Sequence, residues 1–109
     1  MKLQIQHRIL VDGEYWDLER PILDAHRIGD KIVVVFNYMS FPRYKQARNL
    51  MAFDLQKRHL WTAEHPTNGT GDTYIEILSE EPLRVYNFAS FDCHIDLETG
   101  KLLEAEFTK

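Results

Sequence analysis

The chain begins with a regular alternation of apolar and polar positions. From residue 3 to residue 9, apolar residues and His7 alternate with glutamine and arginine, and this period of two predicts a half-buried β-strand over 3–11. Asp12-Gly13 follows. Because both residues accept a positive φ, they predict a tight hairpin into a second strand over 14–18.

Short strand-forming segments, separated by turn residues, continue to the C-terminus. The run from Ile32 to Phe36 is β-branched and aromatic throughout, as in a strand that is buried on both faces. Strands spaced about ten residues apart, with turns between them, are typical of antiparallel all-β domains. The predicted strands after the hairpin are 22–28, 31–38, 49–53, 59–63, 73–78, 83–88, 91–97 and 101–107.

The second half of the chain repeats the first. A shift of 50 positions places Phe36-Asn37-Tyr38 on Tyr86-Asn87-Phe88, and a shift of 42 places Asp54-Leu55 on Asp96-Leu97. The difference between the shifts is an eight-residue insertion in the first copy, between Tyr38 and Arg48. We therefore expect a single all-β domain over 1–109. It should contain two antiparallel four-strand meanders, at about 22–64 and 72–108, after the N-terminal hairpin. The matched asparagines and aspartates are expected to hold turns by accepting backbone N–H bonds.

The two copies end alike, and this ending resembles known proteins. Phe-Asp-Leu followed by Leu-Trp (53–61) and Ile-Asp-Leu-Glu-Thr-Gly-Lys-Leu-Leu (95–103) resemble the outer strands of a quinoprotein-type β-propeller blade. The resemblance implies propeller-blade-like repeats, although two blades are too few to close a ring, and it carries over no quinone or metal ligand. Segments 49–54, 60–61 and 100–109 also resemble short uncharacterised bacterial proteins. Some small proteins of this kind are antitoxins or immunity proteins.

Composition narrows the range of functions. The chain has 13 Lys and Arg against 17 Asp and Glu, a net charge of −4, which weighs against nucleic-acid and membrane partners. Its one cysteine, Cys93, excludes a disulfide framework within the chain. The N-terminus has no apolar signal core, and no run approaches the ~20 apolar residues of a membrane span, so we expect a cytoplasmic location. No cofactor and no metal ion is expected.

The insertion is the one place where the repeat is interrupted. Residues 40–48 combine cations with aromatic side chains, and arginine and aromatic residues are enriched where binding energy concentrates. The alternatives are a solvated hairpin loop and a nucleic-acid contact in which aromatic residues stack on bases. The predicted partner-binding residues are Phe41, Arg43, Tyr44, Lys45 and Arg48.

Three other groups could carry chemistry, and each also has a structural interpretation. Asp92, His94 and Asp96 share one strand face and could ligate a metal or transfer protons, but a solvated face is the simpler expectation. Cys93 points the other way, among apolar residues, and is expected to be buried with a raised pKa. The loop at 65–72 is rich in glycine, but a phosphate-binding loop precedes a helix, and here a strand follows.

We therefore expect a non-enzymatic protein that binds a protein partner, in an immunity- or antitoxin-like role. Open sheets leave edges that invite pairing, so we expect the N-terminal strand to cover an edge or two copies to form a dimer. The alternative is a small-molecule-binding protein or an enzyme with a cleft between the repeats or at a dimer seam. Its polar groups would be Asn37, Asn87, His26, His94 and Asp92.

Overall fold

The computed structural model describes residues 7–108, which form three antiparallel β-sheets. Strands that follow one another along the chain pair with each other inside each sheet. The predicted all-β fold, with two four-strand meanders and an N-terminal hairpin, is therefore confirmed. The hairpin contains β1 (Arg8–Val11) and β2 (Glu14–Asp17); the first meander contains β3 (Ile22–Ile28), β4 (Lys31–Phe36), β5 (Leu50–Asp54) and β6 (His59–Thr62); the second contains β7 (Tyr74–Glu80), β8 (Leu83–Asn87), β9 (Phe91–Ile95) and β10 (Leu102–Phe107).

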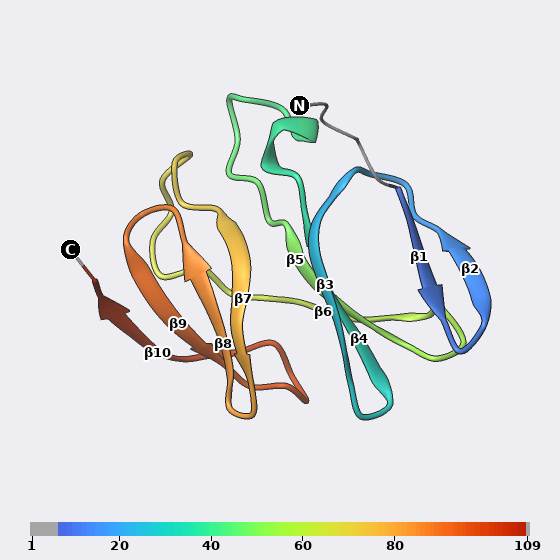
Figure 1. Cartoon of the computed structure of the whole chain (residues 1–109). Helices are drawn as coiled ribbons and strands as arrows, with labels where there is room; N and C mark the ends of the chain where they lie inside the picture. The colour runs from blue at the N-terminus through green and yellow to red at the C-terminus, as the bar shows by residue number, and fades with distance from the viewer. Residues whose placement is uncertain (1–6, 109) are drawn as a thin grey trace, which may run out of the picture.

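The two meanders pack face to face, and Figure 1 shows them as neighbouring layers. Twelve buried side chains from both meanders fill the space between them. Alternation along β4 directs Val33 and Val35 into this core, where residues such as Val85 and Ile95 of the second meander meet them. Burial of these apolar faces against each other is the main source of stability for such an arrangement.

The hairpin forms a third layer on the outer face of the first meander (Figure 1). Ile32, Val34 and Phe36 point out of the central core, and Val11 and Trp16 of the hairpin cover them. As predicted, β4 is buried on both faces. The described part of the N-terminal strand lies over a face of the meander and pairs with no sheet edge, contrary to the expected edge cover. Residues 3–6 of that predicted strand lie outside the described residues.

Turn residues matched by the repeat make the same hydrogen bonds in both meanders. Asn37 Oδ1 accepts a bond from the Met39 N–H and Asn87 Oδ1 from the Ala89 N–H, at 2.9 and 2.8 Å. Asp54 and Asp96 each accept a bond from the N–H two residues ahead. The predicted role of these side chains is confirmed. β4 ends at Phe36, two residues before the predicted end, because Asn37 caps the 3-10 turn η1 (Tyr38–Ser40).

Two buried or half-buried polar side chains, one on β3 and one just before β5, join the first meander to β7. Asp24 of β3 accepts bonds from its neighbour Ala25 N–H and, at 2.9 Å, from the Ile77 N–H of β7. Fully buried Asn49 bonds to both the N–H and the C=O of Tyr74 and to the C=O of Phe36. The backbone N–H of Ile77 and the N–H and C=O of Tyr74 therefore have hydrogen-bond partners in the first meander, although the two meanders form separate sheets.

Gly100 allows the second meander to close against Trp61 of the first. It has a φ of 78°, and a Cβ at this position would lie 2.6 Å from Trp61 Cε3.

We expect Gly100→Ala to lower the free energy of unfolding by about 2–4 kcal/mol, because alanine would strain the left-handed backbone and displace the indole of Trp61. Gly29→Ala, with a φ of 64° and open space around its Cβ, is the control and should cost about 1–2 kcal/mol. Chemical denaturation measures both, and equal losses would contradict the packing account.

Candidate partner-binding site

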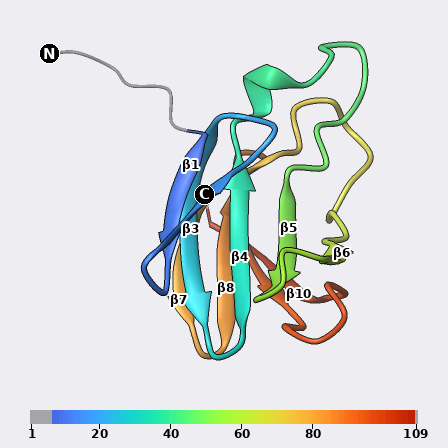
Figure 2. The same ribbon diagram turned by 90° about the vertical axis from the view of Figure 1, so that its right-hand side faces the viewer.

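The insertion lies at one end of the molecule, beside the linker that joins the meanders (Figures 1 and 2). η1 and residues 41–48 connect β4 to β5, and the linker, residues 63–73, connects β6 to β7. Gln46 Nε2 donates hydrogen bonds to the carbonyl oxygens of Thr67 and Gly69, at 2.9 and 3.2 Å. The linker therefore holds the insertion in place.

Large side chains are exposed at this end. Tyr44, at the tip of a turn in the insertion, is 82% exposed; Met39 is 69% and Phe88 61% exposed. Phe88 stacks on Tyr38, with ring centroids 6.3 Å apart and planes 12° apart. Tyr38 and Phe88 are matched residues of the repeat, so the face-to-face packing of the meanders brings these two rings together.

The cations of the insertion have no carboxylate partner within residues 7–108. Arg43, Lys45 and Arg48 are exposed and form no ion pair there. Arg20 is also present, but it donates a bond to the Ser40 carbonyl and lies 4.0 Å from the centre of the Phe41 ring. We name the resulting patch the end surface: Tyr38, Met39, Phe41, Arg43, Tyr44, Lys45, Arg48 and Phe88.

A pocket of about 370 Å³, the end pocket, opens within the end surface. Three of the five predicted residues, Phe41, Arg43 and Lys45, line it. Tyr44 and Arg48 are exposed but do not line it. The remaining lining residues are Tyr38, Met39, Pro42, Ala47, Thr70 and Thr73. Sequence reasoning missed the contribution of the linker, because no pattern in the sequence shows which loops meet.

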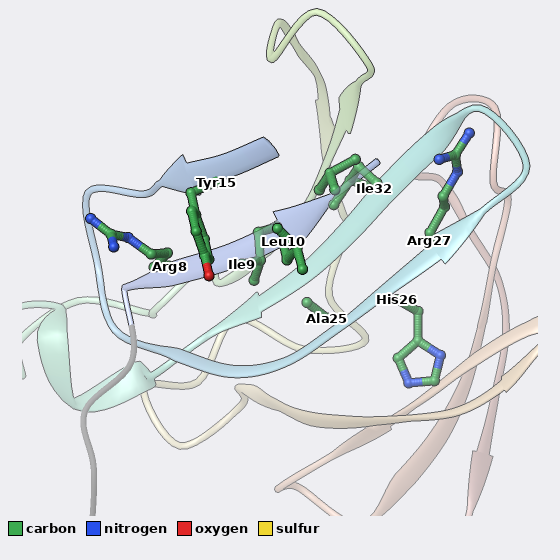
Figure 3. Close-up of a pocket in the computed structure, with 9 residues that line it drawn as sticks. Arg8, Ile9, Leu10, Tyr15, Ala25, His26, Arg27 and Ile32 are labelled. Carbon is green, nitrogen blue, oxygen red and sulfur yellow. The ribbon is translucent and has the colours of Figure 1, made fainter. Parts of the chain in front are cut away.

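A second pocket, of about 480 Å³, lies between the hairpin and the first meander (Figure 3). Apolar residues such as Ile9 and Ala25 occupy its middle, with Arg8 and Arg27 at opposite ends. Both arginines are already paired, with Asp17 and Asp12 respectively. Among residues 7–108, therefore, neither arginine is left free for a ligand, and the end surface is the stronger candidate.

A buried carboxylate organises the linker behind the end surface. Asp72 accepts bonds from the backbone N–H and hydroxyl of Thr67, from His65 Nδ1 and from Asn87 Nδ2, at 2.6–2.9 Å. The side chains of His65 and Asp72 are each only 1% exposed. Burial acts to raise the pKa of the Asp72 carboxyl, but the hydrogen bonds from Thr67, His65 and Asn87 outweigh it and hold the pKa below its ordinary value. The network was not predicted from the sequence.

The chain matches the family described as Domain of unknown function (DUF7957) over residues 2–107. It belongs to this DUF7957 family. No curated protein matches the chain, and no solved structure does. Among residues 7–108, no helix is long and apolar enough to cross a membrane.

The polar residues expected to line a cleft in this DUF7957 chain have separate partners. Asn87 bonds to Asp72, His26 bonds to Glu80 at 2.7 Å, and Asp92 pairs with Arg84. The remaining two, Asn37 and His94, lie in the turn before η1 and on β9. Residues 7–108 contain no group of three or more His, Cys, Asp or Glu side chains that could hold a metal ion. The structure does not assemble these five residues into one site.

Cys93 is buried in the core between the meanders, as predicted. Burial raises the pKa of its thiol to about 11. A thiol with this pKa is almost entirely protonated near neutral pH, and the protonated form is a poor nucleophile. Cys93 is therefore part of the core packing.

The buried His65–Asp72 pair makes stability depend on pH. Burial lowers the pKa of His65 below its ordinary value of 6.5, outweighing the hydrogen bond to Asp72, and Nε2 has no bond partner within residues 7–108. As the pH falls through 6.5, His65 gains a proton in the unfolded chain but stays neutral in the folded chain. We therefore expect the free energy of unfolding to fall toward acid, by up to about 1.4 kcal/mol per pH unit below about pH 7.

Chemical denaturation of two variants at a series of pH values isolates this effect. His65→Gln should flatten the slope, because the titrating ring is gone. The control His59→Gln removes an exposed histidine and should keep the wild-type slope. Identical slopes in the wild type and in His65→Gln would contradict the assignment to His65.

Proposed function

We propose that this chain is a non-enzymatic module that binds a protein partner through the end surface. One observation carries the proposal: the end surface combines exposed aromatic and methionine side chains with three cations. These cations form no ion pair within residues 7–108, although the net charge of the chain is −4. Contiguous exposed apolar groups mark interaction sites, and here Met39 lines the end pocket together with Tyr38, which stacks on Phe88. Tyrosine, methionine and arginine are also the residues that protein interfaces favour.

The charge of the end surface indicates the kind of partner. Arg43, Lys45 and Arg48 have no carboxylate partner within residues 7–108 and attract an acidic surface. An immunity- or antitoxin-like role, suggested by the resemblance to short bacterial proteins, is part of this proposal, as is a cytoplasmic location.

Two architectural expectations also belong to the proposal. We infer that the meanders are copies of one propeller-blade-like unit, and the shared turn bonds of Asn37 and Asn87 support this. We also propose a dimer. Trp16 and Trp61 are buried within one chain and do not contribute to it. Its support is that β6 and β10 lie at sheet edges with no strand partner on their outer side within residues 7–108.

The proposed function is tested by affinity capture of protein partners from a lysate of the cell that makes this chain. The double variant Arg43→Gln/Tyr44→Ser should recover at least tenfold less of a stoichiometric protein partner than the wild type does, because interface arginines and tyrosines concentrate binding energy. The matched control Tyr15→Ser/Arg58→Gln removes an exposed tyrosine and an exposed arginine from elsewhere and should retain the partner. Quantitative mass spectrometry measures both. Recovery of no stoichiometric protein, or equal loss in both variants, would contradict the proposal.

A further inference from the structure

We propose that the end pocket receives one apolar side chain from an acidic peptide segment, whose carboxylates pair with Arg43 and Lys45. This inference rests on the proposed function and specifies the partner's chemistry. The shape and lining of the pocket, its unpaired cations and the fixed position of its walls all fit such a segment.

The lining of the end pocket suits an apolar side chain. Its apolar wall is formed by Tyr38, Met39, Phe41 and Pro42, and Ala47, only 4% exposed, contributes a small buried side chain. The volume of about 370 Å³ is at the lower end of the roughly 300–1,000 Å³ found for ligand pockets. This space suits a single large side chain with its flanking backbone better than it suits an extended ligand.

The charged groups at the rim select what lies beside that side chain. Arg43 and Lys45 both line the pocket, and neither has a carboxylate partner among the described residues. A guanidinium group binds a carboxylate through paired hydrogen bonds, and an ammonium group adds a point charge. Acidic residues on both sides of the buried side chain would satisfy both cations.

The walls of the pocket are held before any partner arrives. Arg20 bonds to the Ser40 carbonyl and stacks on Phe41, Tyr38 stacks on Phe88, and Gln46 bonds to two carbonyls of the linker. Preorganised walls reduce the entropy lost on binding. A short peptide, which orders itself when it binds, is therefore a feasible occupant.

A single-stranded nucleic acid could also place a base on aromatic rings and phosphates near cations. Such binding relies on a positive groove that tracks several successive phosphates. Here, Arg43 and Lys45 are the cations among the lining residues, on a chain with a net charge of −4. The observations favour the peptide, and an oligonucleotide serves as a competing probe.

Fluorescence anisotropy with labelled peptides tests the inference directly. The probes are eleven-residue Gly/Ser peptides with a central Phe or Leu flanked on each side by two Asp. We expect binding that weakens at least tenfold when the central residue becomes Ala. It should weaken by a similar factor when the four Asp become Asn, and with added salt.

Matched variants locate the binding. Thr70→Phe fills the pocket from its exposed rim and should weaken binding at least tenfold, whereas Asn68→Phe, exposed on the same linker but outside the lining, should not. Arg43→Gln/Lys45→Gln should weaken binding at least tenfold, and the control Arg58→Gln/Lys101→Gln should leave it unchanged. Circular dichroism confirms that each variant is folded.

Three results would overturn the inference: no peptide binding at millimolar concentration, equal binding by the Asn peptide, or tighter binding by a labelled oligonucleotide of uridine. Failure of the pocket inference can be distinguished from failure of the proposed function. If the wild type captures a stoichiometric partner through the end surface but no peptide binds, the pocket inference fails and the proposed function stands. If capture also fails, both fail.

Discussion

The arrangement of the end surface depends on the buried carboxylate of Asp72. An ionised carboxylate withdrawn from water is costly unless hydrogen bonds replace its hydration, and here four donors supply them. Two of these donors belong to Thr67 of the linker, and another belongs to Asn87, at the end of β8. The linker is therefore fixed to the second meander, and through the carbonyl groups of Thr67 and Gly69 it fixes Gln46 of the insertion.

This dependence separates the molecule into a frame and a displayed segment. The frame is a pair of meanders that bury each other's apolar faces, with Trp61 against Gly100 and Asn49 between the sheets. The displayed segment is the insertion, which buries little of itself and leaves Tyr44 and three cations in solvent. A rigid frame that presents an exposed loop is a common basis for recognition, because it limits the entropy lost when a partner binds.

Sequence reasoning predicted what depends on local patterns. Short strand-forming segments between turn residues located the strands, the doubly buried β4 was predicted from its β-branched run, and the repeat identified Asp54 and Asp96 as turn residues. It also singled out Phe41, Arg43 and Lys45, which meet in one pocket.

What could not be predicted depends on contacts between distant segments. The bonds of Asp72 to Asn87 and of Asn49 to Tyr74 join loops and strands that no period relates. The stacking of Tyr38 on Phe88 follows only once the meanders are known to face each other. One of two alternatives placed the N-terminal strand along a sheet edge, but its described part lies over the outer face of β4, where Val11 and Trp16 are buried.

Hydrogen exchange of the Asp72→Asn variant, followed by mass spectrometry, tests the central claim most directly. Asparagine preserves the shape of the side chain, but its NH₂ group is itself a donor. In this position it would face the donors of His65, Thr67 and Asn87. The account predicts faster exchange in the linker and, through Gln46, in residues 41–48, while β4, β5, β8 and β9 stay protected. Unchanged exchange in residues 41–48, or loss of protection throughout both meanders, would contradict the claim that this carboxylate positions the end surface.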